Sequence, residues 1–293
     1  MAQSLPTNER RRRLGMLSAN RVVLVFAWAI LGCVLFLGVF GYWLTPYAPT
    51  EQNLLDRLAP PALFGFDSAY LLGSDRLGRD ILARLVFATR ISLAIALAGT
   101  VIGAIIGTLL GFIAAYFRGL IEEAIMTLVD IQASLPFIII ALTLLAFVGN
   151  SLTLFIIIMG IYGWERYARL ARGAVLSAQS QPYARAVRAL GASPWRLYTR
   201  HLLPNIAGVL IVQFTLNYPE IVLLETALSF LGLGIQPPLT SLGQMMGDGR
   251  DLLINAWWLS VIPGTLIFAT TLSISIIGDW LRDRLDPTIG RGE

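Results

Sequence analysis

The charged residues of this chain lie between long uncharged runs, and this pattern predicts helices that cross a membrane. Residues 22–44 form an uncharged run of 23, and residues 91–117 form one of 27. About 20 apolar residues are enough for a helix to cross the hydrocarbon layer of a bilayer. Two further apolar stretches, 205–228 and 258–280, are long enough for the same purpose. Each of these four stretches is therefore predicted to be one transmembrane helix.

The longest uncharged run needs a different interpretation. Residues 131–164 contain no charge over 34 positions, and one helix of that length would measure about 51 Å, too long for a single crossing. The tripeptide Gly149-Asn150-Ser151 supplies a turn near the middle of this region. We therefore predict two spans here, at 124–148 and 152–168.

These runs together predict an all-α, polytopic membrane protein with six transmembrane helices and a pair of cytoplasmic helices. The first run is longer than the core of a signal peptide, so we interpret it as a retained helix. The predicted organisation is a cytoplasmic tail (1–21), a first transmembrane helix (22–45), an extracytoplasmic loop with an amphipathic segment (46–90), a transmembrane domain (91–282) that includes an inner loop (171–204), and a cytoplasmic tail (283–293).

Arginine placement predicts the orientation of the chain. All 22 basic residues are arginines, and with the N-terminus inside, 16 fall in inner segments and six in outer ones. Such an excess is typical of the cytoplasmic side, so both termini are predicted to be cytoplasmic. Orientation also explains the net charge of +4 better than nucleic-acid binding does.

Composition excludes several kinds of chemistry. A phosphate-binding P-loop requires a lysine, and the chain has none, so any ATP must be bound by another subunit. One histidine and one cysteine argue against a metal site. They also leave few nucleophile or base sets for a membrane-embedded enzyme. No catalytic residue, metal ligand or cofactor is therefore predicted in this chain.

A row of glycines marks one face of the second predicted span. The four glycines are four residues apart, at Gly99, Gly103, Gly107 and Gly111. In a membrane, such a bare stripe allows another backbone to approach closely. We predict packing against a neighbouring helix or a partner subunit, with lining of a pore as the alternative.

The inner segment 171–203 reads as two short helices joined at residues 191–194. Gly191 suits the C-terminal end of a helix, and Pro194 suits the first turn of the next one. Lying outside the membrane, this helix pair would form a compact projection. The alternative is an ordinary solvated basic loop.

The same segment resembles the coupling loop of binding-protein-dependent ABC importer permeases. That motif reads Glu-Ala-Ala, three residues, Gly, nine residues, then Ile-x-Leu-Pro. Four residues of this chain match it at the required spacing: Ala186, Gly191, Leu203 and Pro204. Three residues depart from it: Arg185 replaces the Glu, Val187 the second Ala and His201 the Ile.

Three more stretches resemble the C-type permease of the dipeptide and oligopeptide transport family. They are 72–80 (LGSDRLGRD), 228–238 (LSFLGLGIQPP) and 278–287 (GDWLRDRLDP). With the coupling loop, the resemblance extends over roughly residues 22–288. Several long motifs in the same order make this resemblance specific.

The resemblance implies half of the translocation pathway of an ABC importer for di- or oligopeptides, in a bacterial or archaeal cytoplasmic membrane. It implies a second permease as heterodimer partner, two ATP-binding subunits that carry ATP and Mg²⁺, and an extracytoplasmic solute-binding protein. The residues implied to couple to the ATPases are Arg185, Ala186, Val187, Gly191, Ala192, Ser193, Leu203 and Pro204.

Acidic residues in or near the spans are candidates for the translocation path: Asp130, Glu220 and Glu225. An ionised carboxylate at the centre of a bilayer costs about 2.5–3.5 kcal/mol on insertion scales, so each needs a partner or water. Glu220 stands where the family tends to have a small residue. It is predicted either to face the solute or to occupy a packed or protonated site.

Two other functions remain open at this point. A permease for nickel or another metal chelate belongs to the same family. A self-contained channel or carrier would need no ATPase partner, but it gives no reason for the spaced coupling motif.

Overall fold

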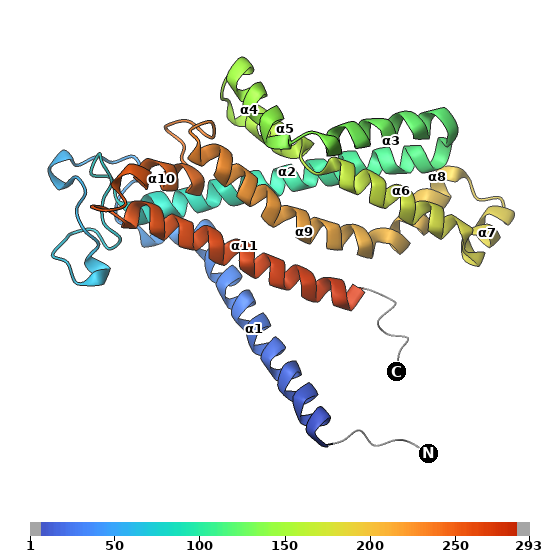
Figure 1. Cartoon of the computed structure of the whole chain (residues 1–293), viewed down its shortest axis with the longest axis horizontal. Coiled ribbons are helices and arrows are strands. Elements are labelled where there is room, and N and C mark those ends of the chain that lie inside the picture. Colours follow the sequence, from blue (N-terminus) through green and yellow to red (C-terminus); the bar gives the residue numbers. More distant parts are fainter. Residues whose placement is uncertain (1–6, 286–293) are drawn as a thin grey trace.

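The computed structural model describes residues 7–285 as a bundle of helices with its long loops gathered at one end (Figure 1). The outermost parts of the two predicted tails, 1–6 and 286–293, lie outside the described residues. The helices are α1 (Thr7–Phe40), α2 (Ile81–Phe117), α3 (Gly119–Ser134), α4 (Phe137–Val148), α5 (Leu152–Ile161), α6 (Trp164–Ser180), α7 (Pro182–Ala189), α8 (Pro194–Leu197), α9 (Leu203–Phe230), α10 (Leu242–Gly249) and α11 (Trp258–Leu285).

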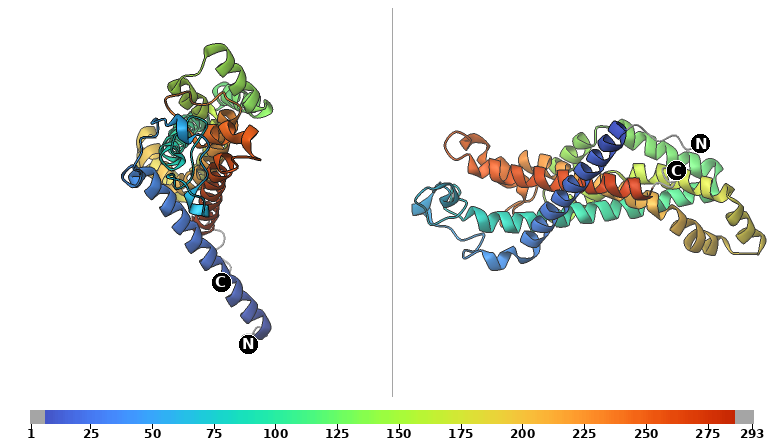
Figure 2. Two further views of the ribbon diagram at one scale, coloured as in Figure 1. Left: turned by 90° about the vertical axis from the view of Figure 1, so that its left-hand side faces the viewer. Right: turned by 90° about the horizontal axis from the view of Figure 1, so that it is seen from below.

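The bundle has two distinct ends (Figure 1). We call the end with segments 45–80 and 231–257 the loop end, and the opposite end, which carries α7 and α8, the knob end. Helix α1 leaves the bundle at an angle, as both views in Figure 2 show. It packs against α2 and α11, and both described ends of the chain, Thr7 and Leu285, point away from the loop end.

The membrane-spanning character of the chain is confirmed, while the number of spans is approximate. Four segments are long and apolar enough to cross a membrane: 21–44, 81–117, 194–230 and 258–285. Helices α3 and α4 meet the same test as a pair, but they are bent by 87° relative to each other. The described residues therefore give four unbroken candidates and one bent pair, where six unbroken spans were predicted.

Local backbone chemistry explains both departures from continuous spans. Between α3 and α4, Leu135 and Pro136 have extended backbones, because the residue before a proline disfavours the helical region. The predicted span 152–168 is divided into α5 and α6. There Gly163 adopts a left-handed conformation with φ of 83°, which glycine accepts without steric cost.

Helix α2 begins ten residues earlier than predicted, at Ile81 rather than 91. The Asp80 carboxylate caps it by accepting hydrogen bonds from the N–H groups of Leu82 (3.3 Å) and Ala83 (2.9 Å). Burial raises the pKa of the Asp80 carboxyl above its ordinary value, although these two bonds oppose the shift. Most of the predicted amphipathic segment is thus the start of α2.

The glycine stripe of α2 lies against α5 and α6 of the same chain. A Cβ atom at Gly99 would lie 2.7 Å from Cβ of Met159, and one at Gly103 would lie 3.2 Å from the carbonyl oxygens of Gly160 and Tyr162. At Gly107 and Gly111 the nearest atoms are also backbone carbonyl oxygens. The absence of side chains therefore allows two backbones to touch.

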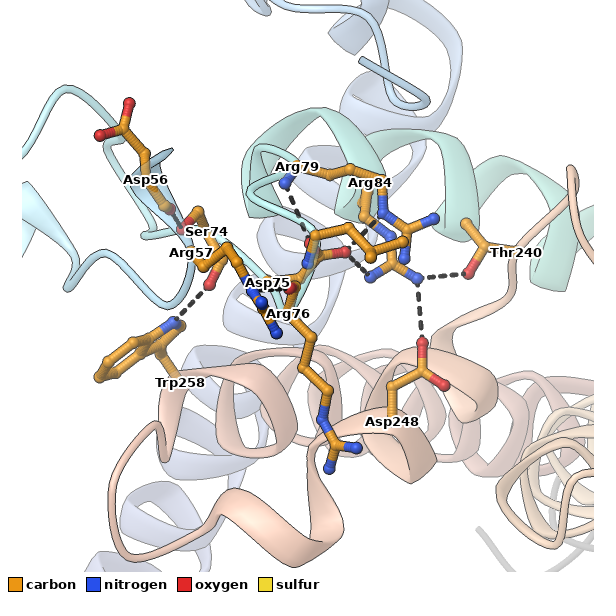
Figure 3. Close-up of polar contacts among 11 residues, drawn as sticks. Asp56, Arg57, Ser74, Asp75, Arg76, Arg79, Arg84, Thr240, Asp248 and Trp258 are labelled. Carbon is orange, nitrogen blue, oxygen red and sulfur yellow. Dashed lines mark hydrogen bonds and ion pairs between the residues drawn. The ribbon is translucent and has the colours of Figure 1, made fainter. Parts of the chain in front are cut away.

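A buried ion network joins the loop end to the bundle (Figure 3). The Asp75 carboxylate accepts hydrogen bonds from the N–H groups of Leu77 and Arg79, and it pairs with the Arg79 and Arg84 guanidiniums, each at 2.6 Å. Arg84 reaches on to Asp248 of α10 at 3.1 Å. Asp75 and Arg84 are each only 3% exposed. The 72–80 motif thus ties the first loop to the second.

Arg84→Met is expected to lower the free energy of unfolding by about 3 kcal/mol, because it removes the buried one of the two guanidiniums that pair with the buried Asp75 carboxylate. Arg76→Met is the matched control, since Arg76 pairs with Asp251 at 3.7 Å on the surface, where such pairs contribute about 0–1 kcal/mol. Chemical denaturation in detergent measures both. Equal losses for the two variants would contradict a structural role for the buried network.

Candidate functional site

The knob, residues 181–202, turns sharply between its two helices. Gly191 follows α7 with φ of 81°. Its N–H donates to the carbonyl oxygen of Arg188 (3.0 Å), and the N–H of Ala192 donates to that of Val187 (3.3 Å). This pair of bonds is a Schellman motif, which ends a helix at a left-handed residue and favours glycine there.

Helix α8 starts again at once after this turn. The Ser193 hydroxyl caps it by accepting a hydrogen bond from the N–H of Arg196 at 3.4 Å, and Pro194 occupies its first turn. A π-helical turn, Tyr198–Leu202, then joins α8 to α9. The knob is therefore held to α9 by continuous helical backbone.

Apolar side chains anchor the knob to three long helices. Ala184, Leu197 and Leu202 are buried in a cluster with Ala115 of α2 and Val175 of α6. The cluster also includes Ile206 of α9. Because packed interiors transmit displacement, a movement of the knob would reach α2, α6 and α9 together.

The outer surface of the knob carries exposed apolar side chains. Leu190 is 87% exposed and Trp195 is 79% exposed, on either side of the Gly191 turn. Of the residues predicted for coupling, the exposed ones are Arg185, Ala186, Gly191, Ser193 and Pro204, and the half-buried ones are Val187, Ala192 and Leu203. Six of these eight lie on the knob, whereas Leu203 and Pro204 begin α9.

The predicted intramembrane acids are not gathered into one site. Three arginines of α6, spaced three residues apart, bind carboxylates on two other helices. Arg166 pairs with Glu220 of α9, Arg169 pairs with Asp130 of α3 at 2.9 Å, and Arg172 pairs with Glu122 of α3.

Glu225 lies apart from this row, in the core of the bundle. Its side chain is fully buried and accepts hydrogen bonds from the hydroxyls of Ser92 (3.1 Å) and Ser229 (2.7 Å). The Ser92 hydroxyl also accepts a hydrogen bond from the N–H of Leu242. Glu225 therefore helps to join α2, α9 and the start of α10.

The sequence interpretation missed Glu165 and Arg166 as members of a polar site. Both lie at the start of α6, within the predicted span. The signal was present, because positions three apart on a helix share a face, and Arg166, Arg169 and Arg172 follow that spacing. Their partners could not be identified from spacing, since these lie 39 to 54 residues away.

Comparison with known proteins gives a family match over most of the bundle. Residues 107–291 match the model of the family described as "Binding-protein-dependent transport system inner membrane component". The matched region contains half of the stripe (Gly107 and Gly111), the whole knob and the α6 arginines. The match covers more than half of the chain.

Curated relatives match along nearly the whole chain. The di/tripeptide transport system permease protein DppC of Pseudomonas aeruginosa is 40% identical over 257 residues, covering 87% of this chain and 85% of that protein. The Escherichia coli K12 dipeptide transport system permease protein DppC is 40% identical, with 87% and 86% covered. The glutathione transport system permease protein GsiD of Pectobacterium atrosepticum is 35% identical, with 87% and 85% covered.

Solved structures share the fold. A chain of the MetNI methionine ABC transporter, described as inward facing, aligns with a TM-score of 0.57 at 22% identity. The alignment covers 69% of this chain and 96% of that one. Since the family model and the curated relatives agree, this chain belongs to the family of inner membrane components of binding-protein-dependent transport systems.

Proposed function

We propose that this chain is one permease subunit of an ABC importer and forms half of the translocation path for di- and oligopeptides. Its partners are a second permease, two ATPase subunits that bind ATP and Mg²⁺, and an extracytoplasmic solute-binding protein. The observation that carries the proposal is the knob, a helix pair that turns at Gly191 of the coupling motif and exposes the apolar side chains of Leu190 and Trp195 beside that turn.

The proposed orientation places the knob end and both termini in the cytoplasm of a bacterial or archaeal cell. The arginine distribution supports this orientation. So does the position of the knob, which lies at the opposite end of the bundle from the long loops (Figure 1). The loop end then faces the solute-binding protein.

In this mechanism, ATP binding closes the ATPase dimer, and the closure displaces the knob. The displacement passes through Leu197 and Leu202 into α2, α6 and α9, which share the buried cluster at the base of the knob. The bundle then exchanges outward for inward access as a set of rigid helices. The energy comes from the different affinities of the ATPases for ATP in the two states.

Peptides are proposed as the solutes because the relatives are named as transporters of dipeptides, tripeptides and glutathione. Those names do not favour the alternative of a nickel chelate. Within the path, we propose Glu220 as the acid that meets the solute, because its side chain is half-exposed. Glu225 is fully buried, and Asp130, although it is more exposed than Glu220, pairs with Arg169 on the α3 side of α6.

The importer should be tested as a complete complex in proteoliposomes. We expect uptake of radiolabelled dialanine to require ATP on the side of the membrane that carries the ATPases, the binding protein on the other side, and both permeases with both ATPase subunits. A nickel–histidine complex serves as the alternative solute. Dialanine uptake by this permease without ATPases would favour a channel or carrier. Uptake of the nickel complex without uptake of dialanine would identify a metal chelate, and not a peptide, as the solute.

A further inference from the structure

Three irregular points in the helices meet at one place in the bundle. The break between α3 and α4 lies beside the break between α5 and α6, because the rings of Phe137 and Tyr162 stack edge to face at 5.1 Å. The second break also lies against α9, where Gly163 contacts the side chain of Asn217. Two residues beyond Asn217, α9 contains Pro219.

A charged group occupies this meeting point. The guanidinium of Arg166 binds Glu220 and lies over the Tyr162 ring, 5.7 Å from its centroid. The Tyr162 hydroxyl also donates to Glu220 at 3.3 Å. The side chains of Arg166 and Glu220 are 43% and 39% exposed. This ion pair is therefore accessible, although it lies where the helices were predicted to be within the membrane.

A second carboxylate stands beside the same guanidinium. Glu165 Oε1 lies 3.7 Å from Nε of Arg166, while Glu165 Oε2 is buried and has no hydrogen-bond partner. Asn217 is fully buried, and both polar atoms of its amide also lack partners. Buried polar atoms are nearly always satisfied. The site thus has unused acceptors around one cation.

Two carboxylates, Glu165 and Glu220, share the single guanidinium of Arg166. With both carboxylates ionised, the site carries one net negative charge. A bound cation would balance that charge. A metal ion does not fit, because within residues 7–285 no three acidic, histidine or cysteine side chains are grouped to hold one. A primary ammonium fits, since it donates up to three hydrogen bonds.

We propose that Glu220, Glu165 and Tyr162 form a subsite for the amino-terminal ammonium of a peptide, and that Arg166 is the counter-cation which the ammonium displaces. In the unliganded site Arg166 neutralises Glu220. When the ammonium binds Glu220, Arg166 moves the short distance to Glu165, whose free Oε2 accepts it. This proposal rests on the proposed function and specifies the substrate as a peptide with a free amino terminus.

The exchange has a consequence for transport. The subsite spans α6, α9 and the break between α5 and α6, and both α6 and α9 share the buried cluster beneath the knob. Displacement of Arg166 breaks its bond between α6 and α9, so the arrival of a solute loosens the same helices that the ATPases move. Peptides whose amino terminus is blocked would leave the α6–α9 pair intact.

The test compares tri-alanine with N-acetyl-tri-alanine as probes. Saturation-transfer NMR of the detergent-solubilised importer, without the binding protein, reports contact with the permease alone. We expect stronger transfer to tri-alanine, and we expect Glu220→Gln to remove the difference. In proteoliposomes, Glu220→Gln should lower uptake of subsaturating tri-alanine about tenfold, in keeping with the loss of one hydrogen bond to a charged group.

Glu122→Gln is the matched control, because it also removes the carboxylate partner of an α6 arginine, two turns farther along. Its uptake should stay within about twofold of the parent. Equal losses in the two variants, or no NMR preference in the parent, would overturn the subsite. If Glu220→Gln does not assemble, Glu165→Gln takes its place in the NMR comparison. A weaker preference for tri-alanine in Glu165→Gln than in the parent would support the subsite, and an unchanged preference would contradict it. Parent protein that takes up no peptide at all would instead refute the proposed function.

Discussion

Gly191→Trp is expected to abolish binding-protein-stimulated ATP hydrolysis and uptake while the permease still inserts and assembles. Gly191 lies at the exposed turn of the knob, and apart from Gly191 and its two chain neighbours, no residue has an atom within 4 Å of where a Cβ at position 191 would be. A side chain there meets no clash inside the chain. It would instead project from the surface between Leu190 and Trp195, which is the surface proposed to enter the ATPase cleft.

Backbone strain makes a separate and smaller contribution to this effect. Because Gly191 has a left-handed conformation, any side chain costs about 1–2 kcal/mol. Gly191→Ala isolates this cost and should retain most of the uptake. Gly149→Trp is the control for exposed bulk, since Gly149 also has a positive φ and open space but lies between α4 and α5.

The measurements are uptake and stimulated ATPase activity in proteoliposomes, with subunit stoichiometry determined in the same samples. We expect Gly149→Trp to transport normally and Gly191→Trp to be inactive at full stoichiometry. Full uptake by Gly191→Trp would show that the knob does not seat against the ATPases. Equal loss in both tryptophan variants would assign the effect to strain.

Gly107→Leu should have the largest effect on assembly. The carbonyl oxygen of Trp164 and the Cβ of Tyr167 already occupy the space that a side chain at position 107 needs. Backbone cannot rotate away as a flexible side chain can, so the helices must separate. Overpacking of this kind costs about 3 kcal/mol or more, and the separation would also open the contact between α2 and α6.

A graded series tests this explanation. Gly107→Ala should be destabilising too, since its Cβ alone is too close to α6. Gly173→Ala is the matched control, because Gly173 is a helical glycine with open space around it. Alanine there should stabilise the helix by about 0.5–1 kcal/mol. Yield of the assembled complex and thermal unfolding in detergent provide the readouts. Normal assembly of Gly107→Leu would mean that α2 and α6 are not in close contact.

Features that depend on neighbours in the chain could be derived from the sequence alone. Long uncharged runs indicated the membrane as solvent, and Gly191 followed by Pro194 indicated a turn between two short helices. The spacing of the glycines from Gly99 to Gly111 indicated a close helix contact. In each case the cause acts within one or two helical turns: hydrophobicity, a left-handed residue, or side chains absent from one face.

Only the tertiary structure decided which distant residues meet. It assigned Glu220 to Arg166, placed the stripe against α5 and α6, and joined Arg84 to Asp248 across 164 residues of sequence. It also divided the predicted fourth span at Gly163, where a contact with Asn217 of α9 accompanies the break. A composition or a spacing specifies which face of a helix is polar or bare. It does not specify the partner of that face, because the partner depends on how all the helices pack at once.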